Sequence, residues 1–253
     1  MEKFIQEITR QAGQLVAEQF GHVGVSFTKK NAADVVTEAD LASNRLIADS
    51  IRQRFPTHGI ISEEQPESNT DAEYVWIADP LDGTRNFSTC TPLFGVMVAV
   101  ARHGVLEMAA IHDPINDRLY FAQAGRGATA NGNPIRCSTQ QVWPYSYGCT
   151  GASVIASKVS GLVGLIKSAA REPFWINQFG SAAVGAMYVA DGRRDWGISF
   201  GGSIWDYAAG VLLMQEAGCV VTNLKGEPWT LQDRQLVAAN PHLHAHLLAI
   251  VRQ

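Results

Sequence analysis

Two features that define other protein classes are missing from this sequence: an excess of positive charge and a long apolar segment at the start of the chain. The net charge is −4 and the pI is about 6.0, which leaves no basic footprint for nucleic acid or an anionic membrane. The first twenty residues carry charges throughout, and their apolar positions follow helical spacing. We therefore expect an amphipathic helix here rather than a secretion signal or a membrane span, and a soluble, cytoplasmic protein without nucleic-acid or membrane partners.

Cysteine is scarce and forms no metal-binding motif. The four cysteines make no C-x-x-C pair and lie far apart, so we interpret them as free thiols in a reducing compartment: Cys90, Cys137, Cys149 and Cys219. The sequence also lacks G-x-x-x-x-G-K-[ST], a glycine-rich dinucleotide fingerprint after a strand, and H-E-x-x-H. ATP cleavage, hydride transfer and zinc proteolysis therefore have no support in the sequence.

The sequence does contain the material for a large α/β core. Hydrophobic residues make up 46 % of the chain and charged residues 17 %. The patterns predict a helix over about 38–54 and short strands over 59–62 and 74–79, followed by a β-rich stretch over 93–136. The second half alternates strands with helices, and periodicity is lost only near 138–150. This order predicts a layered α/β or α+β sandwich.

The segment DPLDGTRNF, residues 79–87, places two carboxylates three residues apart at the end of an expected strand. Asp-Pro and Asp-Gly are common turn dipeptides, so a surface turn is one interpretation. The preceding run YVWIAD, residues 74–79, is apolar and β-branched enough to be buried. Open α/β sheets bind ligands at the carboxyl ends of their strands, so Asp79 and Asp82 are candidate ligand-binding residues.

Further acidic residues lie at the edges of expected elements: Asp40, Glu63, Glu64 and Asp206. Each has a structural explanation of its own, because the two aspartates fit N-terminal capping boxes and the two glutamates fit a solvated loop. Taken together these explanations are strained, since converging buried carboxylates repel one another unless they are protonated or neutralised. An all-oxygen cluster without histidine or cysteine suits a hard cation, magnesium above all.

A magnesium cluster at this position suits phosphoryl transfer. Two ions roughly 3.5–4 Å apart can hold the attacking and leaving oxygens of a phosphoryl group and generate hydroxide from water. Asp79 and Asp82 can serve two ions, with Asp79 bridging them. Gly83 and Thr84 would begin a short helix whose N–H groups face a phosphate. The Thr84 hydroxyl is then placed to orient the attacking water.

The motifs DVVTEAD, GIISEEQ, DPLDGTRNF and WDYAAGVLLMQEAG resemble, in this order, signature segments of the inositol monophosphatase family. The segments IHDPINDRLYFAQAGRGATANG and FGSAAVGAMYVADGRRD extend the resemblance over about residues 29–240. It implies a magnesium-dependent, lithium-sensitive phosphatase with the layered α/β/α/β/α sandwich of the sugar phosphatases, usually a homodimer. The chain, 1–253, would then be one catalytic domain with a metal-binding half of about 1–140 and an α/β half of about 141–253.

The resemblance also implies roles for individual residues. Two to three magnesium ions would be held by Glu63, Asp79, the Leu81 carbonyl, Asp82 and Asp206. The catalytic water would be positioned by Thr84 and Asp40 and by Glu63 at a third ion, and the backbone of Gly83 and Thr84 would bind phosphate. The substrate's alcohol part would contact Asp82, Gly180, Ser181, Ala182, Ser199 and Asp206, with Lys29 and Glu64 as further candidates.

One position departs from the family pattern. Family members that hydrolyse inositol phosphate commonly carry a glutamate four residues after the aspartate matched by Asp195, and this chain has Ser199 there. Serine cannot make the same charge-assisted hydrogen bonds to inositol hydroxyls, typically worth about 1.5–3 kcal/mol. We expect hydrolysis of inositol monophosphate by a metal-activated water. The alternatives are histidinol phosphate, fructose bisphosphate or phosphoadenosine phosphate as substrate, or a catalytically silent binding protein on the same fold.

Overall fold

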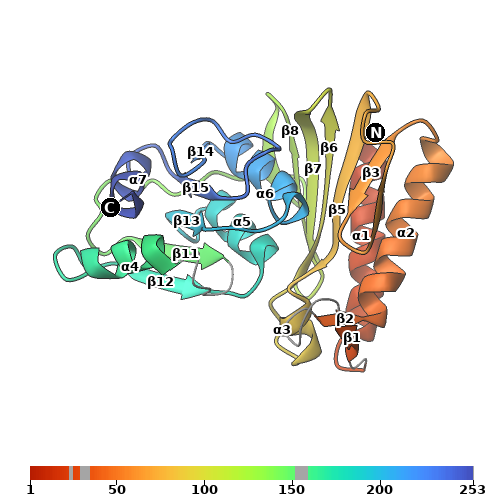
Figure 1. Ribbon diagram of the computed structural model, residues 1–253, viewed down its shortest axis with the longest axis horizontal. Coiled ribbons are helices and arrows are strands. Elements are labelled where there is room, and N and C mark those ends of the chain that lie inside the picture. Colours follow the sequence, from red (N-terminus) through yellow and green to blue (C-terminus); the bar gives the residue numbers. More distant parts are fainter. Residues whose placement is uncertain (23–24, 29–34, 152–158, 253) are drawn as a thin grey trace.

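The chain folds into five layers, helix–sheet–helix–sheet–helix, which follow one another from right to left in Figure 1. The computed structural model describes residues 1–22, 25–28, 35–151 and 159–252. This arrangement is the layered α/β/α/β/α sandwich that the sequence predicted.

The larger sheet has eight strands in the order β10-β9-β8-β7-β6-β5-β3-β4. Its strands are antiparallel except that β3 and β5 run parallel. They are β3 (Gly59–Ser62), β4 (Gln65–Ser68), β5 (Tyr74–Asp82), β6 (Gly95–Arg102), β7 (Val105–Asp113), β8 (Arg118–Gln123), β9 (Gly127–Ala130) and β10 (Asn133–Pro134). The strands expected over 59–62 and 74–79 are confirmed, and the second continues through the DPLD segment.

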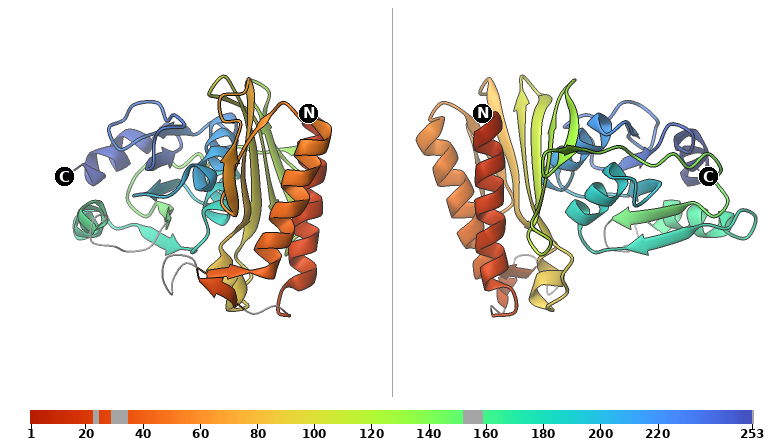
Figure 2. Two further views of the ribbon diagram at one scale, coloured as in Figure 1. Left: turned by 45° about the vertical axis from the view of Figure 1, so that its right-hand side comes forward. Right: turned by 180° about the vertical axis from the view of Figure 1, so that it is seen from behind.

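Two long helices cover the outer face of this sheet, α1 (Glu2–Gln19) and α2 (Glu38–Arg54), as both views in Figure 2 show. The apolar stripe of α1, including Ile5, Ala12 and Val16, is fully buried against the sheet. The start of α2 is fixed by a capping box between Thr37 and Asp40. The amphipathic first helix and the helix over 38–54 are therefore both confirmed.

The central layer consists of α5 (Ala182–Ala190) and α6 (Ile204–Glu216), which lie between the two sheets. Every residue of α6 from Tyr207 to Met214 is buried. Such a helix has no polar face to turn to water, so it is stable only where a sheet covers each side. This burial holds the first turn of α6 against the carboxyl end of β5.

The smaller sheet has the order β12-β11-β13-β15-β14 and is flanked by α4 (Val159–Ser168) and α7 (His244–Val251). Its strands are β11 (Tyr147–Gly151), β12 (Trp175–Gln178), β13 (Trp196–Ser199), β14 (Val220–Thr222) and β15 (Leu236–Ala239). Strand β11 was not expected, because its segment YGCTG shows no alternation. A Cβ at Gly148 would lie 2.0 Å from the Trp196 ring, so the glycine serves strand packing rather than a turn.

A short hairpin of β1 (Val25–Thr28) and β2 (Val35–Thr37) lies beside the five-residue helix α3 (Thr84–Ser88) at one end of the larger sheet. Within the described part of the chain, no helix has the length and hydropathy needed to cross a membrane.

Candidate active site

The two aspartates of DPLD are brought together by a β-bulge in β5. Asp79 pairs with Met97 and Asp82 pairs with Gly95, so an interval of three residues along β5 lies opposite an interval of two along β6. Residues three apart in a regular strand point to opposite faces, and the extra residue of the bulge cancels that alternation. Pro80 fits this position because it has no N–H to donate to the ladder. The segment is therefore a bulged strand end rather than a separate turn.

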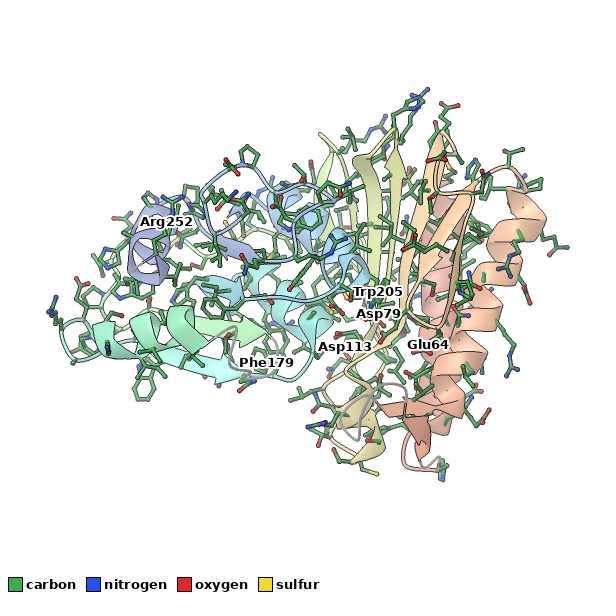
Figure 3. All side chains as sticks on the ribbon, viewed as in Figure 1. Glu64, Asp79, Asp113, Phe179, Trp205 and Arg252 are labelled. Atoms are coloured by element: carbon green, nitrogen blue, oxygen red, sulfur yellow. The ribbon has the colours of Figure 1, made fainter. Side chains whose placement is uncertain are left out.

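Three carboxylates converge at this bulge: Asp79, Asp82 and Asp206 each offer an oxygen within 4.8 Å of the others. Figure 3 labels Asp79 beside Trp205, the residue before Asp206, where β5 meets the start of α6. Only 1 % of the Asp79 surface is exposed. Burial raises the pKa of Asp79 well above its ordinary value, and the neighbouring carboxylates, Glu63 first, raise it further. The cluster therefore accumulates negative charge in a poorly solvated place.

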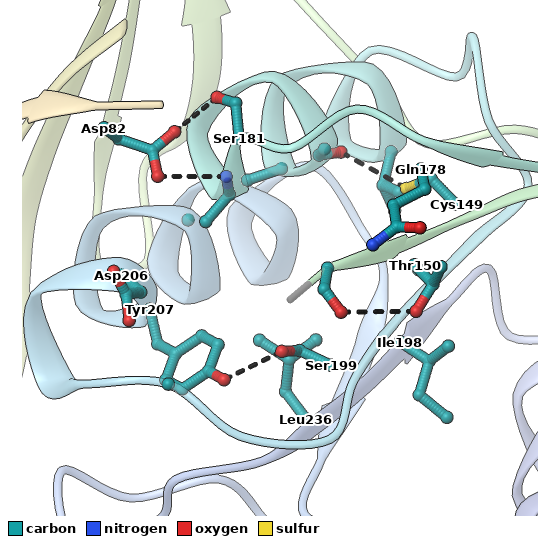
Figure 4. Close-up of a pocket in the computed structure, with 18 of the residues that line it drawn as sticks. Asp82, Cys149, Thr150, Gln178, Ser181, Ile198, Ser199, Asp206, Tyr207 and Leu236 are labelled. Atoms are coloured by element: carbon teal, nitrogen blue, oxygen red, sulfur yellow. Dashed lines mark hydrogen bonds between the residues drawn. The ribbon is translucent and has the colours of Figure 1, made fainter. Parts of the chain in front are cut away.

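Asp82 is held by the N-terminus of α5. Its carboxylate accepts hydrogen bonds from the Ser181 hydroxyl and from the backbone N–H groups of Ala182 at 3.0 Å and Ala183 at 2.8 Å, two of which appear in Figure 4. Burial raises the pKa of Asp82, and these hydrogen bonds lower it. A helix N-terminus favours the ionised form, so these hydrogen bonds offset part of the effect of burial and fix the orientation of the Asp82 side chain.

Asp206 and Glu63 complete the acidic edge from two further elements. Asp206 closes a capping box with Ser203 at the start of α6, so its structural role and its place in the cluster coexist. Glu63 directly follows β3, which runs parallel to β5, and is the strongest charged influence on Asp79. Glu64 is half-buried and lies outside the three-carboxylate cluster.

Thr84 and Asp40 form a hydrogen-bonded pair beside the cluster. The Thr84 hydroxyl lies 2.8 Å from Oδ1 of Asp40 and 2.9 Å from the Leu81 carbonyl. It carries one proton, so it donates to one of these two acceptors at a time. The other oxygen of Asp40 accepts from the Thr37 backbone N–H at 2.8 Å. Asp40 therefore caps α2 with one oxygen and orients Thr84 with the other.

The start of α3 depends on a glycine. Gly83 has φ +87°, and a Cβ there would lie 2.9 Å from the Leu93 carbonyl. The Asn86 amide donates to the carbonyls of Leu93 and Phe179, both at 2.7 Å. Gly180, with φ +69°, passes directly over this amide. Asn86, to which the sequence analysis gave no role, thus joins α3 to the segment that precedes α5.

A cavity of about 450 Å³ opens beside the acidic edge, with Asp82 and Asp206 in its lining. Its wall contains all the residues predicted to contact the alcohol part: Asp82, Gly180, Ser181, Ala182, Ser199 and Asp206. Arg85, Cys149 and Tyr207 also line it and were missed, because they come from three different elements. Lys29 lies outside the described residues.

The donor set fits a hard divalent cation. The cluster supplies carboxylate oxygens only, and it includes two buried aspartates whose pKa values are raised. A bound cation would relieve the repulsion that raises those pKa values, and oxygen-only coordination is what magnesium prefers. Protonation is the other way to relieve it, and the two can be separated by experiment.

In the absence of metal, the contribution of the acidic cluster to the free energy of unfolding should fall as pH rises from about 4 toward neutrality. Asp79, Asp82 and Asp40 all have raised pKa values in the folded protein. The folded state therefore holds protons that the unfolded chain has released, and that stabilisation disappears as pH passes the folded-state values. Histidines with lowered pKa values, His58, His112 and His244, act in the opposite direction, so the cluster is isolated as the difference in stability between wild type and Asp79→Asn, measured by urea unfolding in EDTA. That difference should grow in favour of the variant as pH rises, and added magnesium should reverse it. A difference that does not change with pH would contradict this electrostatic account of the cluster.

Comparison with known proteins identifies the family. A model of the inositol monophosphatase family matches residues 1–253. The chain belongs to this family. It is 36 % identical over 249 residues to the Nus factor SuhB of Escherichia coli strain K12, covering 96 % of this chain and 92 % of that protein.

Solved structures of family members agree in fold. The extragenic suppressor protein suhB of Bartonella henselae is 30 % identical, with a TM-score of 0.92 over 99 % of this chain and 98 % of that one. An IMPase of Thermotoga maritima is also 30 % identical, with a TM-score of 0.90 over 99 % and 96 %. Family membership supports a phosphatase.

One sequence-based prediction is wrong. The low net charge was taken to exclude nucleic acid from the partners, yet the E. coli relative is named as a Nus factor, which is a name from transcription. The physical reason is that net charge governs non-specific attraction to a polyanion. It says nothing about association through a specific surface or through other proteins.

Proposed function

We propose that this inositol monophosphatase family member is a magnesium-dependent phosphomonoesterase acting on a small polyol or sugar phosphate. The observation that carries the proposal is the convergence of three carboxylates at the bulge of β5, beside the Thr84–Asp40 pair and the mouth of a cavity. Since β5 and α6 both contribute, we propose that the whole chain acts as one catalytic domain, with the metal-binding half of about 1–140 supplying most ligands.

The residues that would hold magnesium are Glu63, Asp79, the Leu81 carbonyl, Asp82 and Asp206, for two to three ions. When bound, such ions polarise phosphoryl oxygens and lower the pKa of water. Asp79 would be the bridging ligand, because it is the most buried carboxylate of the cluster and because Glu63, Asp82 and Asp206 all lie close enough to raise its pKa. Asp82 would bind with its orientation already fixed by the N-terminus of α5.

The chain's own groups would orient the water and the phosphate. With the Leu81 carbonyl engaged by an ion, the Thr84 proton points to Asp40, which leaves the Thr84 lone pairs to accept a hydrogen bond from the attacking water. The backbone N–H groups of Gly83 and Thr84 would bind phosphate at the start of α3. Attack on the face opposite the alcohol then sends the leaving group toward the cavity.

The first experiment measures phosphate release from a panel of esters with magnesium, with EDTA, and with magnesium plus lithium. Inositol monophosphate is the substrate that the family suggests first, and histidinol, fructose and adenosine phosphates complete the panel. We expect release that depends on magnesium and falls with lithium. Retained magnesium binding without release from any ester would favour a binding protein and end the enzymatic proposal.

A second candidate function is a role in transcription, supported by the name of the E. coli relative. The two functions can be tested separately, because Asp79 is buried and its replacement by asparagine leaves the exposed surface nearly unchanged. Binding of the purified chain to a transcription elongation complex should be measured for the wild type and for Asp79→Asn. Equal binding by both would establish a role independent of catalysis, and absence of binding by both would remove this candidate.

A further inference from the structure

The cavity beside the acidic edge has an apolar arm that the proposed chemistry does not use. Figure 4 shows the acidic end at Asp82 and Asp206, and the arm continues toward Cys149 and Ile198. The arm is lined mainly by small and apolar side chains from α5, α6 and β11–β13, with Gln178 and Thr150 as polar neighbours; the small and apolar ones include Cys149, Gly185, Ala186, Val189, Gly197 and Met214. A total volume of about 450 Å³ lies within the range of roughly 300–1,000 Å³ that encloses a drug-sized ligand.

The arm stays open because of a glycine that packing does not require. Gly185 lies in the middle of α5, where glycine is less stable than alanine. A Cβ at Gly185 would have its nearest neighbour, the Cys149 sulfur, at 3.7 Å, which is ordinary van der Waals contact. By contrast, a Cβ at Gly210 of α6 would meet Ala186 at 2.7 Å. Gly210 is thus needed for helix packing, whereas Gly185 only leaves space in the cavity.

The hydroxyl groups around the arm already donate hydrogen bonds to other groups of the protein. The Tyr207 hydroxyl donates to the Arg234 carbonyl at 3.2 Å, so it accepts from Ser199 at 2.8 Å. The Thr150 hydroxyl donates to the Gly151 carbonyl. These hydroxyl groups can accept hydrogen bonds from a ligand, but they are uncharged and cannot make charge-assisted hydrogen bonds to a ring with many hydroxyls. Ligand hydroxyls placed against the apolar walls would lose their hydrogen bonds to water without gaining others.

We propose that the arm receives an apolar ring of the alcohol part of the substrate. The proposed hydrolysis of a phosphate monoester is retained, but the alcohol that the cavity prefers then carries an aromatic or comparable hydrocarbon ring rather than the fully hydroxylated ring of a polyol such as inositol. This inference rests on the proposed function for the position of the phosphate. Ser199 is the residue that sets the preference at the arm's entrance, and Gly185 is the one that keeps the arm open.

Binding of non-hydrolysable phosphonates tests the inference without turnover. Propylphosphonate, 3-phenylpropylphosphonate and a phosphonate bearing an inositol ring are titrated calorimetrically into the full chain with magnesium present. We expect the phenyl compound to bind about tenfold or more tighter than propylphosphonate, from burial of the ring. Gly185→Leu should abolish that difference, while Gly185→Ala, which adds one methyl group to a helix that favours it, should reduce it.

Two results would overturn the inference: tighter binding of the inositol compound than of the phenyl compound by the wild type, or an unchanged phenyl preference in both Gly185 variants. Ser199→Glu should shift binding toward the inositol compound, and a shift away from it would count equally against the role of Ser199. Failure of the proposed function is distinguishable. Ring-selective binding without phosphate release from any ester would refute the enzymatic proposal but support the proposed ring-binding arm. Phosphate release without ring-selective binding would support the enzymatic proposal but refute the arm.

Discussion

Replacing Asp79 by asparagine should lower phosphate release by at least about a thousandfold. Asp79 is buried in the acidic edge, and neighbouring carboxylates raise its pKa: Glu63, Asp82, Asp206 and Asp40. Asparagine keeps the shape but removes the charge that a pair of cations would share. Losing roughly 4 kcal/mol of transition-state stabilisation corresponds to a factor of about 10³.

The same substitution should stabilise the metal-free protein. Burial and like charge oppose ionisation of Asp79, so removing that ionisation relieves the folded state and not the unfolded one. At about pH 8 in EDTA we expect the free energy of unfolding of Asp79→Asn to lie above that of the wild type. Opposite signs for activity and stability distinguish loss of a metal ligand from general damage to the fold.

The matched control is Asp71→Asn, which removes one negative charge from an exposed position before β5, at the other end of that strand from the bulge. This substitution should change neither phosphate release nor the free energy of unfolding appreciably. Activity of Asp79→Asn above a tenth of wild type would show that the cluster is not the catalytic centre. Lower stability of Asp79→Asn in EDTA would show instead that Asp79 makes a favourable contact in the metal-free state.

Much of this site was predictable from sequence, because its residues lie at the ends of helices and strands. Asp40 and Asp206 are helix-capping residues by pattern, and both keep that role in the structure. Asp79 ends an apolar strand, which placed it at a sheet edge. In each case the sequence marks the end of an element, and the ends of neighbouring elements meet at one side of the molecule.

The parts that were missed depend on contacts between distant segments. The bulge that aligns Asp79 with Asp82 is visible only in the register against β6. The Asn86 amide serves carbonyls 7 and 93 residues away, and no local pattern indicates the second. Strand β11 has a glycine where the Trp196 ring lies, so its sequence reads as a loop although it occupies the interior of the smaller sheet.

Thr84→Ala should lower kcat by about 10²–10⁴-fold with little change in KM, the range typical for loss of a group that positions a proton in the transition state. The Thr84 hydroxyl links Asp40 to the space above the acidic edge, and alanine removes that link without touching a carboxylate. Magnesium binding should therefore survive. The measurement is steady-state phosphate release, with magnesium affinity by calorimetry as the second readout.

Thr84→Ser is the control that separates the hydroxyl from the methyl group. Serine restores the hydroxyl, so activity within about tenfold of wild type is expected if the hydroxyl orients the water. Serine also restores the hydrogen bonds to Asp40 and the Leu81 carbonyl, so unfolding temperature and magnesium affinity of Thr84→Ala must separate a catalytic from a structural role. A kcat loss in Thr84→Ala that comes with a lower unfolding temperature and weaker magnesium binding would assign Thr84 to holding α3 in place and would leave the water without an orienting group in this site.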